Sequence, residues 1–155
     1  MTKSQILNDE LEQIKQDLIK KHLELGMKAS GGWIDSLNVQ TKGLSGIIYG
    51  KPYTEQLVNG REHGKFPPIS MIKQWIIDKN ITPFDKISIS SLAFLIARKI
   101  AKEGTKYFKQ GGTDLVSSVI TPERIQMILD KVSEFHINSF LSEINGVFNE
   151  LKTVA

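Results

Sequence analysis

The chain of 155 residues contains no cysteine. This excludes a disulfide framework and any zinc site built from thiolates, and it fits synthesis in a reducing compartment. The sequence also has no run of 18 consecutive apolar residues, which excludes a membrane-spanning helix of ordinary length. The N-terminal residues lead into a charged amphipathic segment without an apolar signal core, so we expect a protein made in the cytoplasm.

Sequence motifs of catalytic and cofactor sites are missing as well. There is no Gly-x-Ser-x-Gly elbow, no phosphate-binding loop and no dinucleotide fingerprint. Asp9, Glu10 and Glu12 are close together, but they are expected on the solvated face of a charged helix. We therefore predict a protein that is not an enzyme and that carries no cofactor.

The three histidines do not form a metal site in the sequence. His22 is expected in a charged helix, His63 in a loop, and His136 on the apolar side of a helix as a tolerated, partly buried residue. None has a second histidine or a carboxylate at metal-ligand spacing. A small enzyme that uses His63 or His136 as its acid–base group is the residual alternative.

Charge is distributed unevenly, although the net charge is only +3. Residues 1–41 carry five Lys/Arg and six Asp/Glu, residues 42–109 carry twelve and five, and residues 110–155 carry three and six. A basic middle between acidic flanks fits a surface for nucleic acid, complementary contacts between subunits, or a solvated face.

Hydrophobic spacing predicts a long helix over residues 3–26, followed by a hairpin. Leu7, Leu11, Ile14, Leu18 and Leu25 form one narrow apolar stripe, which Lys21 interrupts. After the glycines at 31 and 32, alternation over residues 33–41 predicts a strand. A turn at 42–43 and a second strand over 44–49 complete the hairpin. A lone hairpin is marginal in water and needs helices or strands from another chain to cover it.

Helices are predicted for most of the remaining chain. A short helical turn over 52–60 precedes a helix over 69–80, whose inner face is expected to hold Ile69, Ile72, Trp75 and Ile76. The segment from about 88 to 104 is apolar almost all round at 92–97, as in the central element of a core. Residues 111–112 are a hinge, and 114–120 fit either a short strand or a helical turn.

The last helix is predicted over residues 121–151, with Thr121 as its N-cap. Its apolar stripe consists of Ile125, Leu129, Val132, His136, Phe140, Ile144, Val147 and Leu151. The fold class is thus α+β, with a long N-terminal helix, a small antiparallel hairpin, packed central helices and a long C-terminal helix. We expect one domain over 1–155, with the helix at 121–151 as an extension that reaches a partner.

One irregular segment combines glycines, cations and consecutive prolines. As a docking loop it presents Arg61 and Lys65 to a neighbouring protein or to phosphates; as a simple connector it tucks Phe66 into the core. We favour docking, with seven residues in the loop: Gly60, Arg61, Gly64, Lys65, Phe66, Pro67 and Pro68. A second group of candidate cations faces a partner or a channel: Arg98, Lys99, Lys102 and Lys106.

Three stretches in a fixed order resemble a known family. They are residues 30–39 after the long first helix, residues 53–69 with Trp75 and Ile76, and residues 92–100 leading to Gly104 and Thr105. Together they resemble the tail-completion and head–tail connector (neck) proteins of tailed bacteriophages. The likeness covers about residues 1–110, and it departs from the family pattern in lacking a third strand before Tyr53.

The resemblance implies a structural virion protein made in the host cytoplasm. In that family the subunits form a homo-oligomeric ring, six-fold or twelve-fold, at the portal–tail junction. The partners implied are portal or adaptor proteins, tail proteins, and genomic DNA that passes through the lumen without sequence-specific contact. The loop at 60–68 would then lie at an intersubunit or lumen-facing surface. The alternative function is a basic nucleic-acid-binding module of a phage or bacterium.

Overall fold

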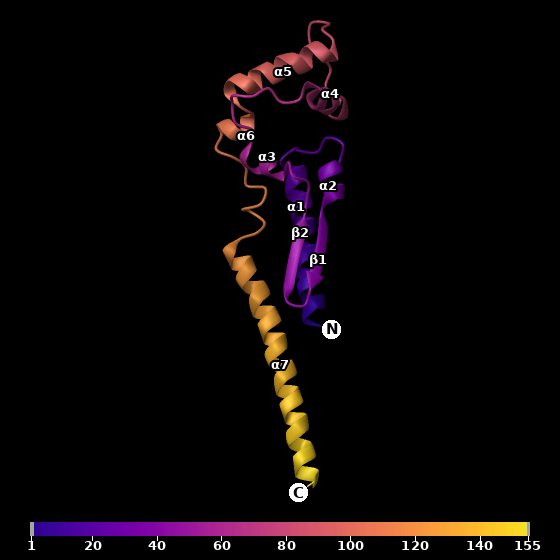
Figure 1. Ribbon diagram of the computed structural model, residues 1–155, viewed down its shortest axis with the longest axis vertical. Coiled ribbons are helices and arrows are strands. Elements are labelled where there is room, and N and C mark those ends of the chain that lie inside the picture. The colour runs from indigo at the N-terminus through magenta and orange to yellow at the C-terminus, as the bar shows by residue number, and fades with distance from the viewer. Residues whose placement is uncertain (1, 155) are drawn as a thin grey trace.

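The computed structural model describes residues 2–154, with side chains as far as residue 147. The fold is α+β and mostly helical, as predicted, with a long helix at each end of the chain and one antiparallel hairpin (Figure 1). Its elements are α1 (Lys3–Glu24), α2 (Gly32–Ser36), β1 (Asn38–Lys42), β2 (Ser45–Tyr49), α3 (Thr54–Asn59), α4 (Ile69–Asp78), α5 (Ile89–Glu103), α6 (Lys106–Lys109) and α7 (Pro122–Val154).

Helix α1 begins at a capping box. The Thr2 hydroxyl accepts a hydrogen bond from the Gln5 backbone N–H at 3.1 Å, and the Gln5 side chain accepts one from the Thr2 backbone at 2.6 Å. This arrangement satisfies N–H groups that have no partner inside the helix. Ile14 and Leu18 of the apolar stripe are buried, so the predicted helix is confirmed to within two residues of its end.

The predicted strand over residues 33–41 is wrong in its first half, because Gly32–Ser36 forms helix α2. Trp33 and Leu37 are both buried, at 3% and 7% exposure. Positions i and i+4 share a face in a helix and also in a strand, so their apolar character does not separate the two. The strand β1 starts only at Asn38 and pairs with β2 in a register that sets Val39 opposite Ile48.

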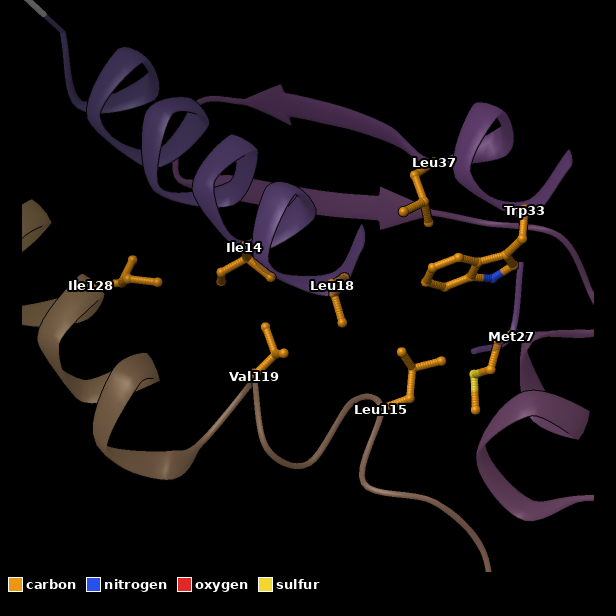
Figure 2. Close-up of a cluster of buried hydrophobic side chains, with 8 residues drawn as sticks. All are labelled: Ile14, Leu18, Met27, Trp33, Leu37, Leu115, Val119 and Ile128. Carbon is orange, nitrogen blue, oxygen red and sulfur yellow. The ribbon is translucent and has the colours of Figure 1, made fainter. Parts of the chain in front are cut away.

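The main hydrophobic core is assembled from α1, α2, α7 and the turn segment at 113–120 (Figure 2). Leu115 and Val119 of this segment are buried in this core. The residues for which the sequence left a strand or a helical turn open form turns, with the Ser118 N–H donating to the Asp114 carbonyl. Ile48 of the hairpin packs against the same core. The hairpin thus covers one side of α1.

Helices α4 and α5 form a second, smaller core, made of Ile72, Ile76, Leu92, Ala93 and Ala97. The predicted inner face of α4 is only half right, because Trp75 is 41% exposed. The prediction that α5 is buried all round is wrong, since Phe94 and Leu95 are exposed. These two helices pack mainly on each other, which leaves one side of each without a cover.

Helix α7 runs antiparallel to α1, held by a series of polar contacts. Arg124 pairs with Asp17 at 2.7 Å and Lys131 pairs with Glu10, so residue numbers rise on α7 as they fall on α1. At the start of α1, the Lys3 ammonium donates to Nδ1 of His136 at 2.6 Å. Beyond this contact α7 continues past the N-terminus (Figure 1). At 1.5 Å per residue the projecting part, Ile137–Val154, is roughly 27 Å long.

Only part of the apolar stripe predicted for α7 lies on the side that packs on α1, where Val132 is half-buried four residues after Ile128. Ile128 is buried at 6% exposure, whereas Ile125, Leu129 and Phe140 of the predicted stripe are 42–55% exposed. His136 is exposed, not partly buried as predicted, because it lies at the edge where α7 leaves α1. Leu151 lies outside the residues whose side chains are described. The helix therefore carries apolar residues on more than one side.

Candidate functional site

The loop predicted to be a docking loop leaves α3 at Gly60, in a backbone conformation that requires glycine. Gly60 has φ 76° and ψ −174°, and Gly104, at the end of α5, has φ 79° and ψ 178°. This region is essentially restricted to glycine. A Cβ at Gly60 would lie 2.1 Å from the backbone nitrogen of Phe108, so the space also excludes any side chain. Two segments 44 residues apart meet here without room for a methyl group.

Backbone hydrogen bonds fasten the loop to the junction between α5 and α6. The Arg61 N–H donates to the Thr105 hydroxyl at 2.9 Å, and the Thr105 N–H donates to the Arg61 carbonyl at 3.0 Å. The Gly64 N–H donates to the Ala101 carbonyl at 2.8 Å. The two stretches that carried the family resemblance, around Gly60 and around Gly104, are therefore in direct contact.

The second half of the loop is partly buried and partly presented to solvent. Pro67 is buried, while Lys65 is exposed and Phe66 is 52% exposed. The Phe66 ring stacks on that of Phe94, with ring centroids 6.1 Å apart. Phe66 thus lies outside the core, contrary to the simple connector interpretation, and contributes to an apolar surface on the α4–α5 pair.

A cleft of about 790 Å³ separates the α4–α5 pair from the end of α1, with α2 and α3 beside it. One wall carries His22, Met27, Trp33 and Tyr53, from α1 and the segments that follow it. The opposite wall carries Met71, Ile72, Trp75, Ile96 and Ile100 from α4 and α5. The cleft is therefore mainly apolar, with aromatic rings on both sides.

All the charged residues that line the cleft are cations. They are Arg61 of the loop together with Lys79, Lys99, Lys106 and Lys109, and among the described residues no aspartate or glutamate lines it. The Lys79 ammonium donates to the Gly26 carbonyl and connects the two walls. Of the candidate cations, Lys99 and Lys106 line this cleft, whereas Arg98 and Lys102 do not.

Comparison with protein-family models, curated proteins and solved structures gives no match for this chain. Over the described part of the chain, no cluster of three or more His, Asp or Glu side chains is arranged to hold a metal ion. Nor is any described helix both long and apolar enough to cross a bilayer.

His22 is the cleft residue that the sequence analysis misplaced. It is buried at 2% exposure rather than lying on a charged helix face, and its ring stacks on Trp33 with centroids 4.5 Å apart. Burial, and then the nearby charge of Lys79, lowers the pKa of His22 below its usual 6.5. Its Nδ1 has no hydrogen-bond partner among the side chains and backbone that the structure describes. The sequence does contain a signal for the burial of His22. His22 follows Leu18 by four residues, so it lies on the apolar stripe where Lys21, three residues after Leu18, had been taken to interrupt it.

The titratable aromatic groups of the cleft favour their neutral forms. The one buried histidine is held neutral and stacked on an indole, and burial raises the pKa values of Tyr53 and Tyr107 in the same cleft. Among the described residues, those that line the cleft beside these groups include no aspartate or glutamate. Apolar walls with a cationic rim fit an amphipathic acidic ligand.

Proposed function

We propose that this protein is a structural subunit of a homo-oligomeric ring at the head–tail junction of a tailed phage. In this role it completes or attaches the tail and encloses the DNA channel, with portal or adaptor proteins and tail proteins as neighbours. It would act in the virion, by assembly and without catalysis. The family resemblance of residues 1–110 supports the location, and the surface of the chain supports the assembly.

The observation that carries the assembly is the area of surface the chain exposes. A compact monomer of 17.4 kDa is expected to expose roughly 7,900 Å². The chain exposes 10704 Å², which is more by about 2,800 Å². Obligate subunit interfaces bury areas of this order, about 2,000–5,000 Å². We infer that neighbouring subunits cover much of the difference.

The exposed apolar residues lie on separate parts of the molecule, as contacts with more than one neighbour require. Leu44 and Ile47 are exposed on the hairpin, Met71 and Phe94 on the α4–α5 pair, and Leu141 on α7. Within the described residues the sheet has two strands, so each strand has an outer edge free for pairing. A ring subunit meets two neighbours through different surfaces, which is consistent with this distribution.

The four candidate cations divide into two groups in this proposal. Lys99 and Lys106, which line the cleft, would face a protein partner. Arg98 and Lys102 are exposed on α5 and stand one helical turn apart outside it, where they would face the DNA channel. Contacts of this kind are made with phosphates and read no sequence.

Assembly is tested with the full-length chain by sedimentation velocity and electron microscopy over a range of concentrations. We expect a closed oligomer, six-fold or twelve-fold, that forms at high concentration or on adding the portal protein. A species that stays monomeric at high concentration, and does not grow with portal or tail partners, would contradict the proposal.

DNA binding separates the proposal from the nucleic-acid-binding alternative. A monomeric binder that neutralises several phosphates loses affinity steeply with salt, with a slope of about −0.9 per phosphate. The ring subunit should show no tight binding to a short duplex at low salt before it assembles. Tight, salt-dependent binding by the monomer would favour the alternative.

A further inference from the structure

The projecting part of α7 has an apolar side that faces away from α1. Ile137 follows the buried Ile128 by nine residues, which is two and a half helical turns at about 3.6 residues per turn, so the two lie on opposite sides of the helix. Ile137, Phe140, Leu141 and Val147 are each 50–57% exposed. We call these four residues the outer stripe. Phe140 and Leu141 follow Ile137 by three and four residues, and Val147 follows Phe140 by seven, as in helices that bind in a groove.

Acidic residues flank the outer stripe. Residues 132–147 contain Glu134 and Glu143 and no lysine or arginine, which gives a net charge of −2. Both glutamates are exposed. At about 100° per residue, Glu134 lies to one side of the stripe and Glu143 to the other. The outer stripe is thus an apolar band with Glu143 of the projecting part on one side and, on the other, Glu134, which lies just before the projecting part.

The cleft is complementary to this helix in both polarity and charge. Its walls are apolar and its charged lining residues are all cations, with Lys99 and Lys106 among them. An α-helix about 10 Å in diameter occupies about 120 Å³ per residue, so 790 Å³ corresponds to roughly two turns. Two turns are enough to bring Ile137, Phe140 and Leu141 into the cleft together.

We propose that the cleft of one subunit binds the projecting part of α7 from a second copy of the chain. The helix does not reach the cleft of its own chain, because the contacts of Arg124 and Lys131 hold α7 along α1. Its end points away from the α4–α5 pair (Figure 1). The contact joins two different surfaces, so repeating it produces a ring or a filament. This inference rests on the proposed ring and identifies the contact that closes it.

Site-specific cross-linking tests the contact, and the absence of native cysteine removes any background. Met71 in the cleft wall is 63% exposed, and Leu141 in the outer stripe is 50% exposed. A chain with Met71→Cys is mixed with a chain with Leu141→Cys and oxidised. We expect a covalent heterodimer. As a matched control, a chain with Lys42→Cys, exposed on the hairpin, should not cross-link to the Leu141→Cys chain.

Charge reversal checks that the contact is the one proposed. Glu134→Lys with Glu143→Lys should lower the yield of the heterodimer about tenfold or more, because it opposes like charges. Adding Lys99→Glu and Lys106→Glu to the cleft chain should restore the yield. A structural defect in the helix would not be restored by substitutions in the cleft.

The outcomes separate this inference from the proposed function. If closed oligomers form normally but Met71→Cys and Leu141→Cys do not cross-link, the cleft contact is wrong and the proposed ring still stands. Absence of any oligomer, with or without the portal protein, would overturn both. A third outcome is that an added short DNA duplex binds in the cleft and blocks the cross-link between Met71→Cys and Leu141→Cys, while the outer stripe stays exposed. The inference would then be wrong.

Discussion

Replacing Gly60 with alanine should be among the most damaging single changes in this protein. The substitution places a Cβ in a backbone region that costs about 1–3 kcal/mol for residues other than glycine. The same Cβ would lie 2.1 Å from the backbone nitrogen of Phe108, so the α5–α6 junction must move. That movement breaks the two hydrogen bonds between Arg61 and Thr105, worth about 1 kcal/mol each. The expected loss of unfolding free energy is about 3–5 kcal/mol.

Gly26→Ala is the matched control, because the two glycines differ mainly in their surroundings. Gly26 has φ 68°, but a Cβ there meets nothing within 4 Å. Its cost is the left-handed backbone alone, about 1–2 kcal/mol. Urea unfolding followed by circular dichroism measures both. With an m-value of about 2 kcal/mol/M, the midpoint should fall by about 2 M for Gly60→Ala and by about 0.7 M for Gly26→Ala.

Two results would refute this reasoning. Equal midpoint shifts for the two variants would mean that the contact between the loop and the α5–α6 junction does not contribute to stability. Full additivity of Gly60→Ala and Gly104→Ala would mean that these glycines do not act on one shared contact, because residues that share a contact give non-additive effects. In either case the placement of the loop against α5 and α6 would be wrong.

Two further predictions concern the core. Because the pKa of His22 is lowered in the folded state, the unfolded chain takes up a proton near pH 6.5 while the folded chain does not. The free energy of unfolding therefore decreases as the pH falls below 6.5. His22→Leu should remove this dependence, so that its urea midpoint changes less between pH 7.5 and pH 5 than that of the unmodified chain. Ile14→Ala, at 1% exposure, should cost about 2–5 kcal/mol in urea unfolding, whereas Leu44→Ala, at 64%, should change it by less than about 0.5 kcal/mol.

The sequence alone predicted the elements whose signals are local. Thr121 before Pro122 fixed the start of α7, and its hydroxyl does accept the Arg124 N–H at 3.1 Å. Ser88 likewise caps α5 by accepting the Ser91 N–H. A cap and a helical period involve residues within one or two turns of each other, so they can be recognised without knowing what packs on them.

The cleft could not be predicted, because its walls come from segments far apart in the sequence. His22 and Trp75 belong to different helices, and only the packing of α4 on α5 decides which side of each faces outward. The same holds for α7, where the buried side is the one that carries Ile128 into the core beside Ile14 of α1, and the ion pairs to Asp17 and Glu10 lie along this contact. An apolar stripe shows that one side of a helix is to be buried, but not whether residues of the same chain or of another chain bury it.

The ion pairs that align α7 with α1 divide this helix into a part that belongs to the folded domain and a part that extends beyond it. Ile128, through which α7 enters the main core, lies before His136, while the residues after His136 set how far the helix extends beyond α1. Removing two turns from this extension would shorten the reach by about 11 Å without disturbing a core residue. In the proposed ring, insertion or deletion in this part of α7 would therefore change the distance between neighbouring subunits at little cost to folding.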